Sequence, residues 1–286
     1  MSDMLQVMAA PFAACMVLVA MLAYLGIHII AREVIFVDLS LAQMAALGST
    51  CSLLFGLDSN SPQGYAFALA FALLGAFIFA ATRMRRERRR VPQEAIIGIV
   101  YVVATAAVIL VADRAPQGAE AIKEVMVGSI LWITWPSILK MLLVYIGVGI
   151  VHWFLRRQFL TISLNEDEAE RQGWRVRWRD FLFYATFGVV ITVAVPIAGV
   201  LLVFTFLVVP AVVAFLFTRR TISLMTISWA ASAIASAIGL AASFRFDLPT
   251  GPLIVCVFGL VLLAAGGVRR WLTARETSQP GGLNPG

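Results

Sequence analysis

Lysine and histidine are nearly absent from this sequence. Lysine occurs only at Lys123 and Lys140, and neither lies in a Gly-x-x-x-x-Gly-Lys-Ser/Thr loop. The chain therefore has no usual motif for binding nucleotide phosphates, and any ATP it depends on must be bound by another subunit. The two histidines, His28 and His152, are far apart, and nucleophilic triads and zinc-protease motifs are missing. We expect a protein that is not an enzyme and binds no cofactor itself.

Cysteine and charged residues are also scarce. The three cysteines, Cys15, Cys51 and Cys256, lie far apart within apolar runs and lack the paired spacing of a disulfide or metal framework. Charged residues make up 13% of the chain and hydrophobic residues 61%, with a mean hydropathy of +0.91. One soluble core would not need so much apolar sequence, so the composition predicts an all-α, polytopic membrane protein.

Apolar runs long enough to cross a bilayer recur along most of the chain. About nine spans are predicted within a transmembrane domain that covers residues 1–276. A polar tail rich in Gly and Pro, 277–286, is expected to be disordered. The predicted spans are 8–30, 35–57, 64–82, 94–112, 136–155, 181–197, 200–218, 222–243 and 252–270.

The longest uncharged stretch, 181–217, is predicted to form the centre of the bundle. It is long enough for about two crossings, and the segment from Pro196 to Gly199 is the expected break. Pro210 then lies well inside the second crossing, where it frees a backbone carbonyl. That carbonyl is tolerated at membrane depth only where neighbouring helices or a water-filled cavity satisfy it.

Arginine clusters set the expected orientation. They occur at 83–90, 156–179, 219–220 and 269–275, which fall on one side of the membrane if the N-terminus is outside and the C-terminus is cytoplasmic. We expect a multi-pass protein of the bacterial cytoplasmic (inner) membrane. The net charge of +6 is accounted for by these loops and does not predict nucleic-acid binding.

The loop predicted at 156–180 contains a short acidic helix. Asn165 is a plausible N-cap, acidic residues fill the first turn, and Gly173 can end the helix. Two interpretations follow from the residues alone: a solvated connector, or a docking helix for a cytoplasmic partner.

The second predicted span carries an unusual polar set: Asp38, Ser40 and Gln43. Asp38 is about one turn from the cytoplasmic end of the span and could simply reach interfacial water, whereas a functional interpretation places it on a substrate path. Asp38 and Gln43 lie about 140° apart around a helix, so a shared site would need a local break. The alanines and Gly48 among them suit close helix packing.

Five separated blocks resemble the membrane permeases of metal-ion ABC importers, the family that carries zinc, manganese or iron. They span about residues 30 to 270, nearly the whole membrane domain. The blocks are Glu94-Ala-Ile-Ile-Gly-Ile-Val-Tyr, Val127-Gly-Ser-Ile-Leu, the acidic block Glu166 to Gly173, the block from Gly199 through Pro210, and Asp247-Leu-Pro249-Thr-Gly251.

The resemblance implies a type II importer-like permease that works as a homodimer in membrane lipid. Two ATPase subunits would bind it from the cytoplasm, and a metal-binding protein would dock outside. Alternating access would be driven by ATP on the partner subunit. The resemblance also favours the docking interpretation of the acidic helix, in which the ATPase-coupling residues are Glu166, Asp167, Glu168, Ala169 and Gly173. Gly199, Pro210, Pro249 and Gly251 would be structural.

The second span departs from the family pattern Gly-Asp-x-x-x-His. Alignment on Gly48 places Gln43 where histidine is expected and Leu39 where the acid is expected, with Asp38 displaced by one residue. An amide is a poorer zinc ligand than imidazole. The substrate path is still assigned to Asp38, Ser40, Gln43 and Glu94, with Asp38 as the candidate metal ligand.

Two other classes of protein stay open on the residues. An ion-gradient-driven transporter of a small solute would use Asp38 and Glu94 as protonatable groups. A membrane scaffold would transport nothing.

Overall fold

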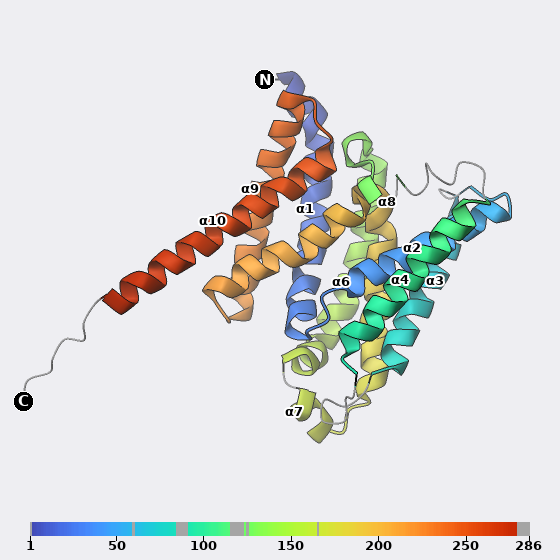
Figure 1. Cartoon of the computed structure of the whole chain (residues 1–286), viewed down its shortest axis with the longest axis horizontal. Coiled ribbons are helices and arrows are strands. Elements are labelled where there is room, and N and C mark those ends of the chain that lie inside the picture. Colours follow the sequence, from blue (N-terminus) through green and yellow to red (C-terminus); the bar gives the residue numbers. More distant parts are fainter. Residues whose placement is uncertain are drawn as a thin grey trace, which may run out of the picture.

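The computed structural model describes residues 2–58, 61–83, 91–114, 123, 126–164 and 166–278. Throughout this part of the chain the regular elements are helices, so the predicted all-α class is confirmed (Figure 1). The elements are α1 (Ser2–Ala31), α2 (Val37–Leu54), α3 (Pro62–Ala81), α4 (Gln93–Ala112), η2 (Ile130–Trp132), α6 (Trp135–Leu164), α7 (Glu166–Arg171), α8 (Val176–Phe217), α9 (Thr221–Phe246) and α10 (Thr250–Ser278).

Eight of the described helices are long and apolar enough to cross a membrane. The nine predicted spans differ from this number only at α8, a run of 42 residues interrupted at Gly199 by non-helical backbone with φ 76° and ψ 158°. The two limbs of α8, residues 176–198 and 200–217, meet at an angle in Figure 1. At 1.5 Å per residue each limb is about 30 Å long, so each can cross a bilayer by itself.

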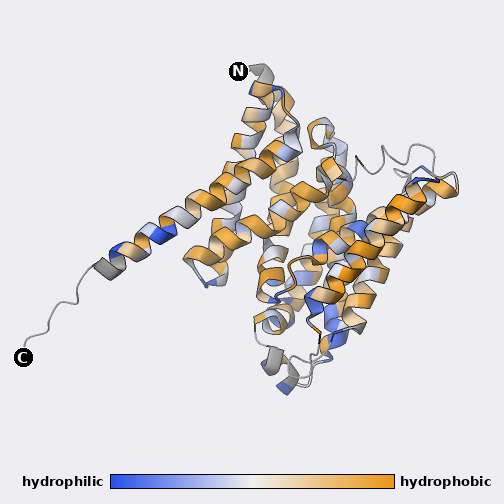
Figure 2. Cartoon of the chain, viewed as in Figure 1, coloured by the Kyte–Doolittle hydropathy of each residue, from blue (hydrophilic) through white to orange (hydrophobic). Residues whose placement is uncertain are grey.

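The central position predicted for 181–217 is confirmed. Helix α8 packs against α1, α2, α3, α6, α9 and α10. Its side chains Phe183, Tyr184, Phe187 and Phe206 are among the largest fully buried groups of the protein. Outward-facing residues of α4, α6 and α10 are instead largely apolar and exposed, and Figure 2 shows α4 and the first part of α10 as mainly hydrophobic.

Glycine allows the kink in α8 to pack tightly against the segment before η2. A Cβ on Gly199 would lie 2.4 Å from the carbonyl carbon of Val127, and one on Gly128 would lie 2.3 Å from the backbone of Ala198. Both glycines have positive φ, which side chains disfavour. The Ser129 N–H also donates to the Ile197 carbonyl at 3.0 Å. Two of the blocks that resemble the permease family therefore meet at this joint.

The other positions predicted to be structural also lie at helix contacts or ends. Pro210 is buried in the second limb of α8, and its own carbonyl accepts a hydrogen bond of 3.1 Å from the buried Ser228 hydroxyl of α9. Pro249 directly precedes α10, and its carbonyl accepts from the Leu253 N–H at 3.1 Å. A Cβ on Gly251 would lie 3.0 Å from the Val127 carbonyl oxygen, so Gly251 belongs to the same joint as Gly199.

Two predicted boundaries were wrong. The loop predicted at 156–180 is shorter, because α6 continues to Leu164 and α8 begins at Val176. The predicted tail begins too early, because α10 extends to Ser278; residues 279–286 lie outside the described part of the chain. Both errors arise because an arginine-rich or polar segment can continue a helix beyond the membrane, where charge no longer opposes it.

Candidate functional site

Asp38, Ser40 and Gln43, here called the α2 polar set, are all buried. Each side chain is at most 1% exposed. The idea that Asp38 simply reaches water at the end of the helix is therefore wrong within this chain, because α3, α4 and α8 pack around α2. Contact with water therefore does not explain why a carboxyl group occurs at this position.

The α2 polar set has polar atoms without hydrogen-bond partners. They are Asp38 Oδ1, Ser40 Oγ and Gln43 Nε2. An unpartnered polar atom in a buried site costs about 1–3 kcal/mol, so such atoms are rare unless they bind something else. Three on one helix are the strongest local indication of a ligand in the described structure.

The three side chains do not form one cluster. Helix α2 is continuous from Val37 to Leu54, so the local break that would bring Asp38 and Gln43 together is not present. Ser40 and Gln43 are three residues apart and share one side of the helix, whereas Asp38 lies on another. A solute that moves along α2 would meet them in sequence and not at the same point.

Glu94 lies beside the first turn of α2. Its carboxylate accepts a hydrogen bond of 3.0 Å from the Phe36 N–H, one of the free donors at the start of α2. It is also within electrostatic reach of Asp38. Glu94 therefore links α4 to α2, and with Asp38 it places two carboxyl groups at this end of the polar set.

Small residues hold α2 close to its neighbours. A Cβ on Gly48 would lie 2.3 Å from the Phe67 carbonyl oxygen of α3, and one on Gly75 would lie 3.1 Å from Leu41 and Met44. The packing role predicted for Gly48 is thus confirmed. Any opening along α2 requires a movement of whole helices, because the α2–α3 contact has no space for side chains to rearrange.

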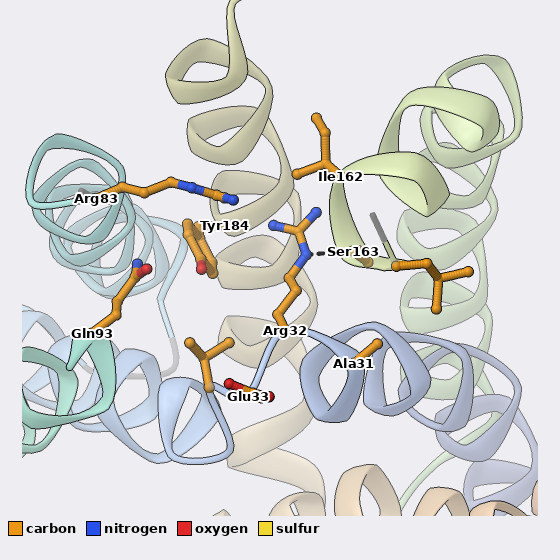
Figure 3. A pocket seen from close by; sticks show the side chains of 10 residues that line it. Ala31, Arg32, Glu33, Arg83, Gln93, Ile162, Ser163 and Tyr184 are labelled. Carbon is orange, nitrogen blue, oxygen red and sulfur yellow. Dashed lines mark hydrogen bonds between the residues drawn. The ribbon is translucent and has the colours of Figure 1, made fainter. Parts of the chain in front are cut away.

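A second buried polar region lies where α6 leads into α7. Asp180 is completely buried and pairs with both Arg32, at 2.8 Å, and Arg83. We call these three residues the ionic junction. Their side chains join the ends of α1 and α3 to the start of α8, and Figure 3 shows Arg32 and Arg83 reaching into the same pocket from different elements.

Further polar groups extend the ionic junction into the bundle. The Arg32 Nε–H donates to the Ser163 hydroxyl at 2.8 Å (Figure 3). Ser163 is also 2.9 Å from His28 Nδ1. His152 contacts Tyr24 at 3.3 Å and Thr186 at 2.9 Å. The histidines, far apart in sequence, both pack against Tyr24.

Sequence reasoning missed the ionic junction because its residues were assigned to loops. A signal was present: Asp180 is the last charge before the long uncharged stretch. An acid at that position, with arginines near the same ends of other spans, is a candidate for a buried pair.

The predicted coupling helix is present as α7. Gly173 follows it with φ 70°, and the Trp174 N–H bonds to the Ala169 carbonyl at 3.4 Å, so glycine ends the helix as predicted. Ala169 is fully buried and Glu168 pairs with Gln172 at 2.8 Å. The predicted N-cap Asn165 and the side chains of Glu166, Asp167 and Glu170 lie outside the described residues.

Among the described residues, no three or more His, Cys, Asp or Glu side chains gather in a way that could hold a metal ion. Asp38 and Glu94 are two carboxyl groups, which is short of such a set. The prediction of Asp38 as a metal ligand therefore stays a prediction, and any ion at this point would need further ligands.

Comparison with known proteins gives relatives that are named as membrane proteins of metal transport systems. Over 228 residues the chain is 25% identical to the manganese transport system membrane protein MntB of Synechocystis sp., covering 77% of this chain and 74% of that protein. It is 26% identical over 214 residues to the chelated iron transport system membrane protein YfeC of Yersinia pestis, covering 75% and 72%.

A solved structure shares the fold. PsaBC from Streptococcus pneumoniae, determined in complex with Fab, superposes with a TM-score of 0.78 at 22% identity, covering 96% of this chain and 98% of that one. The ABC 3 transport family matches residues 4–268, nearly the whole length of the chain. The resemblance of the five sequence blocks is confirmed by this match: the chain belongs to the ABC 3 transport family.

Proposed function

We propose that this chain is the membrane permease subunit of an ATP-driven importer of divalent metal ions. The observation that carries the proposal is the α2 polar set, in which the buried oxygens Asp38 Oδ1 and Ser40 Oγ have no hydrogen-bond partner, inside a member of the ABC 3 transport family. Relatives named as manganese and chelated iron transport proteins support a metal ion, with or without a chelator, as the cargo.

Oxygen ligands at the α2 polar set favour manganese or ferrous iron over zinc. Asp38 and Ser40 offer oxygen, and Gln43 stands where an imidazole would favour zinc. Asp38 lies on a different side of α2 from Ser40 and Gln43, so the helix offers only one or two ligands to an ion at any position along it. The ion would therefore keep part of its water or chelate shell. Weak, successive contacts suit a path that must release its cargo.

The burial of these residues supports alternating access as the proposed mechanism. Each member of the α2 polar set is enclosed by its own chain, so cargo reaches it only after α2 and its neighbours separate. ATP binding to a partner subunit would supply the differential free energy for that movement. In this scheme a second copy of the chain completes the path, and a metal-binding protein delivers cargo from outside.

Helix α7 is the proposed contact with the ATPase. It is a separate short helix at one end of the bundle, directly after α6 and close to the ionic junction (Figure 1). Force applied to α7 reaches α6 through Leu164 and α8 through the segment that ends at Arg175. Ser163 and Asp180 lie near these two connections and meet at Arg32.

Metal uptake by membrane vesicles that contain the permease and the ATPase encoded beside it tests the proposal. We expect ATP-dependent accumulation of manganese or iron that is abolished when the P-loop lysine of the ATPase is replaced. Neutral residues in place of Glu166 through Glu170 should reduce both co-purification of the ATPase and uptake. Accumulation that follows the proton gradient and ignores the ATPase variant would instead show a secondary transporter.

A further inference from the structure

An apolar groove lies between α1, α6 and α9, away from the α2 polar set. Helix α1 packs against both α6 and α9, and the groove runs over its surface with a volume of about 320 Å³. Ala20 and Tyr24 line it from α1, Gly149 and Trp153 from α6, and Met225 from α9. The groove shares Tyr24 and His152 with the polar groups that extend the ionic junction, but its apolar surface has not been assigned a role.

The polar groups beneath the groove are already engaged inside the protein. His152 is 97% buried and contacts Tyr24 and Thr186 through its two ring nitrogens, at 3.3 and 2.9 Å. The groove thus presents the rings of His152 and Tyr24, and it offers few polar atoms to an occupant. An occupant that fills it must be largely hydrocarbon.

One charged side chain, Arg156, lines the groove. Its guanidinium lies 4.3 Å from the centroid of the Trp153 ring, and this cation–π contact holds the charge at the groove edge. Arg156 is exposed and forms no ion pair with another described residue. The edge is therefore positive and accessible beside an apolar channel.

In the orientation that the arginine clusters predict, the groove lies at the level of the inner leaflet of the bilayer. Arg156 directly follows the predicted apolar span 136–155 of α6, and Thr221 is the first residue of α9 after the basic pair at 219–220. Tryptophan and arginine at such depths are typical of the interface with anionic lipid head groups.

We propose that the groove binds one acyl chain of an anionic phospholipid, whose phosphate pairs with Arg156. Charge complementarity identifies the occupant: a positive edge, an apolar channel and a location in the leaflet that carries anionic lipid. The proposal is independent of which cargo the protein carries.

Two pairs of variants test the site in the full-length permease. Gly149→Leu fills the groove, and a Cβ at this position meets nothing within 4 Å, so the variant should fold. Gly147→Leu is its control, since that Cβ also meets nothing within 4 Å and Gly147 does not line the groove. Arg156→Gln removes the charge, and Arg157→Gln removes the neighbouring charge outside the groove.

Native mass spectrometry of the detergent-purified permease, titrated with phosphatidylglycerol or phosphatidylcholine, provides the measurement. We expect the wild-type protein, Gly147→Leu and Arg157→Gln to retain phosphatidylglycerol preferentially. Arg156→Gln should bind it about fivefold more weakly, the effect of one basic side chain near an anionic surface. Gly149→Leu should lose retention of both lipids.

Three results would overturn the proposal. One is retention by Gly149→Leu equal to that of Gly147→Leu. Another is displacement of bound lipid by millimolar glycerol 3-phosphate, which would show that the head group alone binds. A third is unchanged lipid retention together with loss of the permease dimer in Gly149→Leu, which would assign the groove to a second copy of the chain.

Discussion

The α2 polar set and the ionic junction are both buried in the same bundle, and they differ in whether their polar atoms have partners. Asp180 lies between two arginines, and Arg32 donates to Ser163 as well. Asp38 Oδ1, Ser40 Oγ and Gln43 Nε2 have no such partners. Paired charges fix the relative positions of helices, whereas unpaired polar atoms are left for a ligand. The ionic junction is therefore expected to govern stability and the α2 polar set to govern transport.

The largest effect is expected from Asp180→Asn. This change leaves Arg32 and Arg83 buried without their shared counter-charge, and breaking a buried pair from one side costs about 3–5 kcal/mol. We expect a greatly lowered unfolding temperature, or loss of the protein from the membrane, measured by fluorescence-detected size exclusion after heating. Asp113→Asn, at a position that is 80% exposed, is the control and should change nothing. Equal melting of the two variants would refute the structural role of the ionic junction.

A smaller effect is expected from Ser163→Ala. The hydroxyl accepts from Arg32 and contacts His28, so its removal leaves a charged donor unsatisfied, at a cost of about 1.5–3 kcal/mol. The same heating assay should place this variant between wild type and Asp180→Asn. Thr105→Ala, which removes a hydroxyl bonded only to the Tyr101 carbonyl one turn earlier in α4, is the matched control. A melting temperature as high as that of the control would show that the junction ends at Arg32.

Gln43→Met is expected to reduce transport without reducing stability, in contrast to the two changes at the ionic junction. Methionine has nearly the shape of glutamine and removes a buried donor that has no partner, so stability is expected to stay the same or rise by about 1 kcal/mol. Metal uptake should fall several-fold at an equal membrane level. If the variant melts well below wild type, Gln43 has a structural partner. The α2 polar set would then contribute to stability, as the ionic junction does.

The smallest change in stability is expected from Ser40→Ala, within about 0.5 kcal/mol, because the hydroxyl oxygen is buried without a partner. Uptake kinetics of this variant should show a modest increase in the metal concentration needed for half-maximal rate. Ser52→Ala, which removes a hydroxyl bonded to the Ser49 carbonyl on the same helix, is the control for a serine without a role on the path. Identical kinetics for Ser40→Ala and this control would remove Ser40 from the path.

Most of the fold could be predicted because it depends on local signals. Span lengths follow from apolar runs, the break at Gly199 follows from proline and glycine, and the end of α7 follows from Gly173. The limits of α6 and α10 were harder, because hydropathy marks where a helix leaves the membrane and not where the helix ends. Helix α6 continues nine residues past the predicted span to Leu164.

The candidate site could be predicted only in part, because partners come from tertiary contacts. The sequence marked Asp38, Ser40 and Gln43 as unusual but could not show whether packing or water would surround them. It also could not show that Arg32, Arg83 and Asp180 meet, since they are separated by up to 148 residues. Pairing between distant helices depends on the arrangement of the bundle, which a single sequence does not reveal.

Uptake by Asp38→Asn tests the central claim most directly. The measurement is ATP-driven accumulation of radioactive manganese or iron in vesicles with the partner ATPase present, divided by the amount of permease in the membrane. We predict at least a tenfold loss of uptake with an unchanged melting temperature, because the substitution removes a carboxylate ligand and breaks no pair within the protein. Wild-type uptake of both metals by Asp38→Asn would contradict the assignment of the α2 polar set to the metal path.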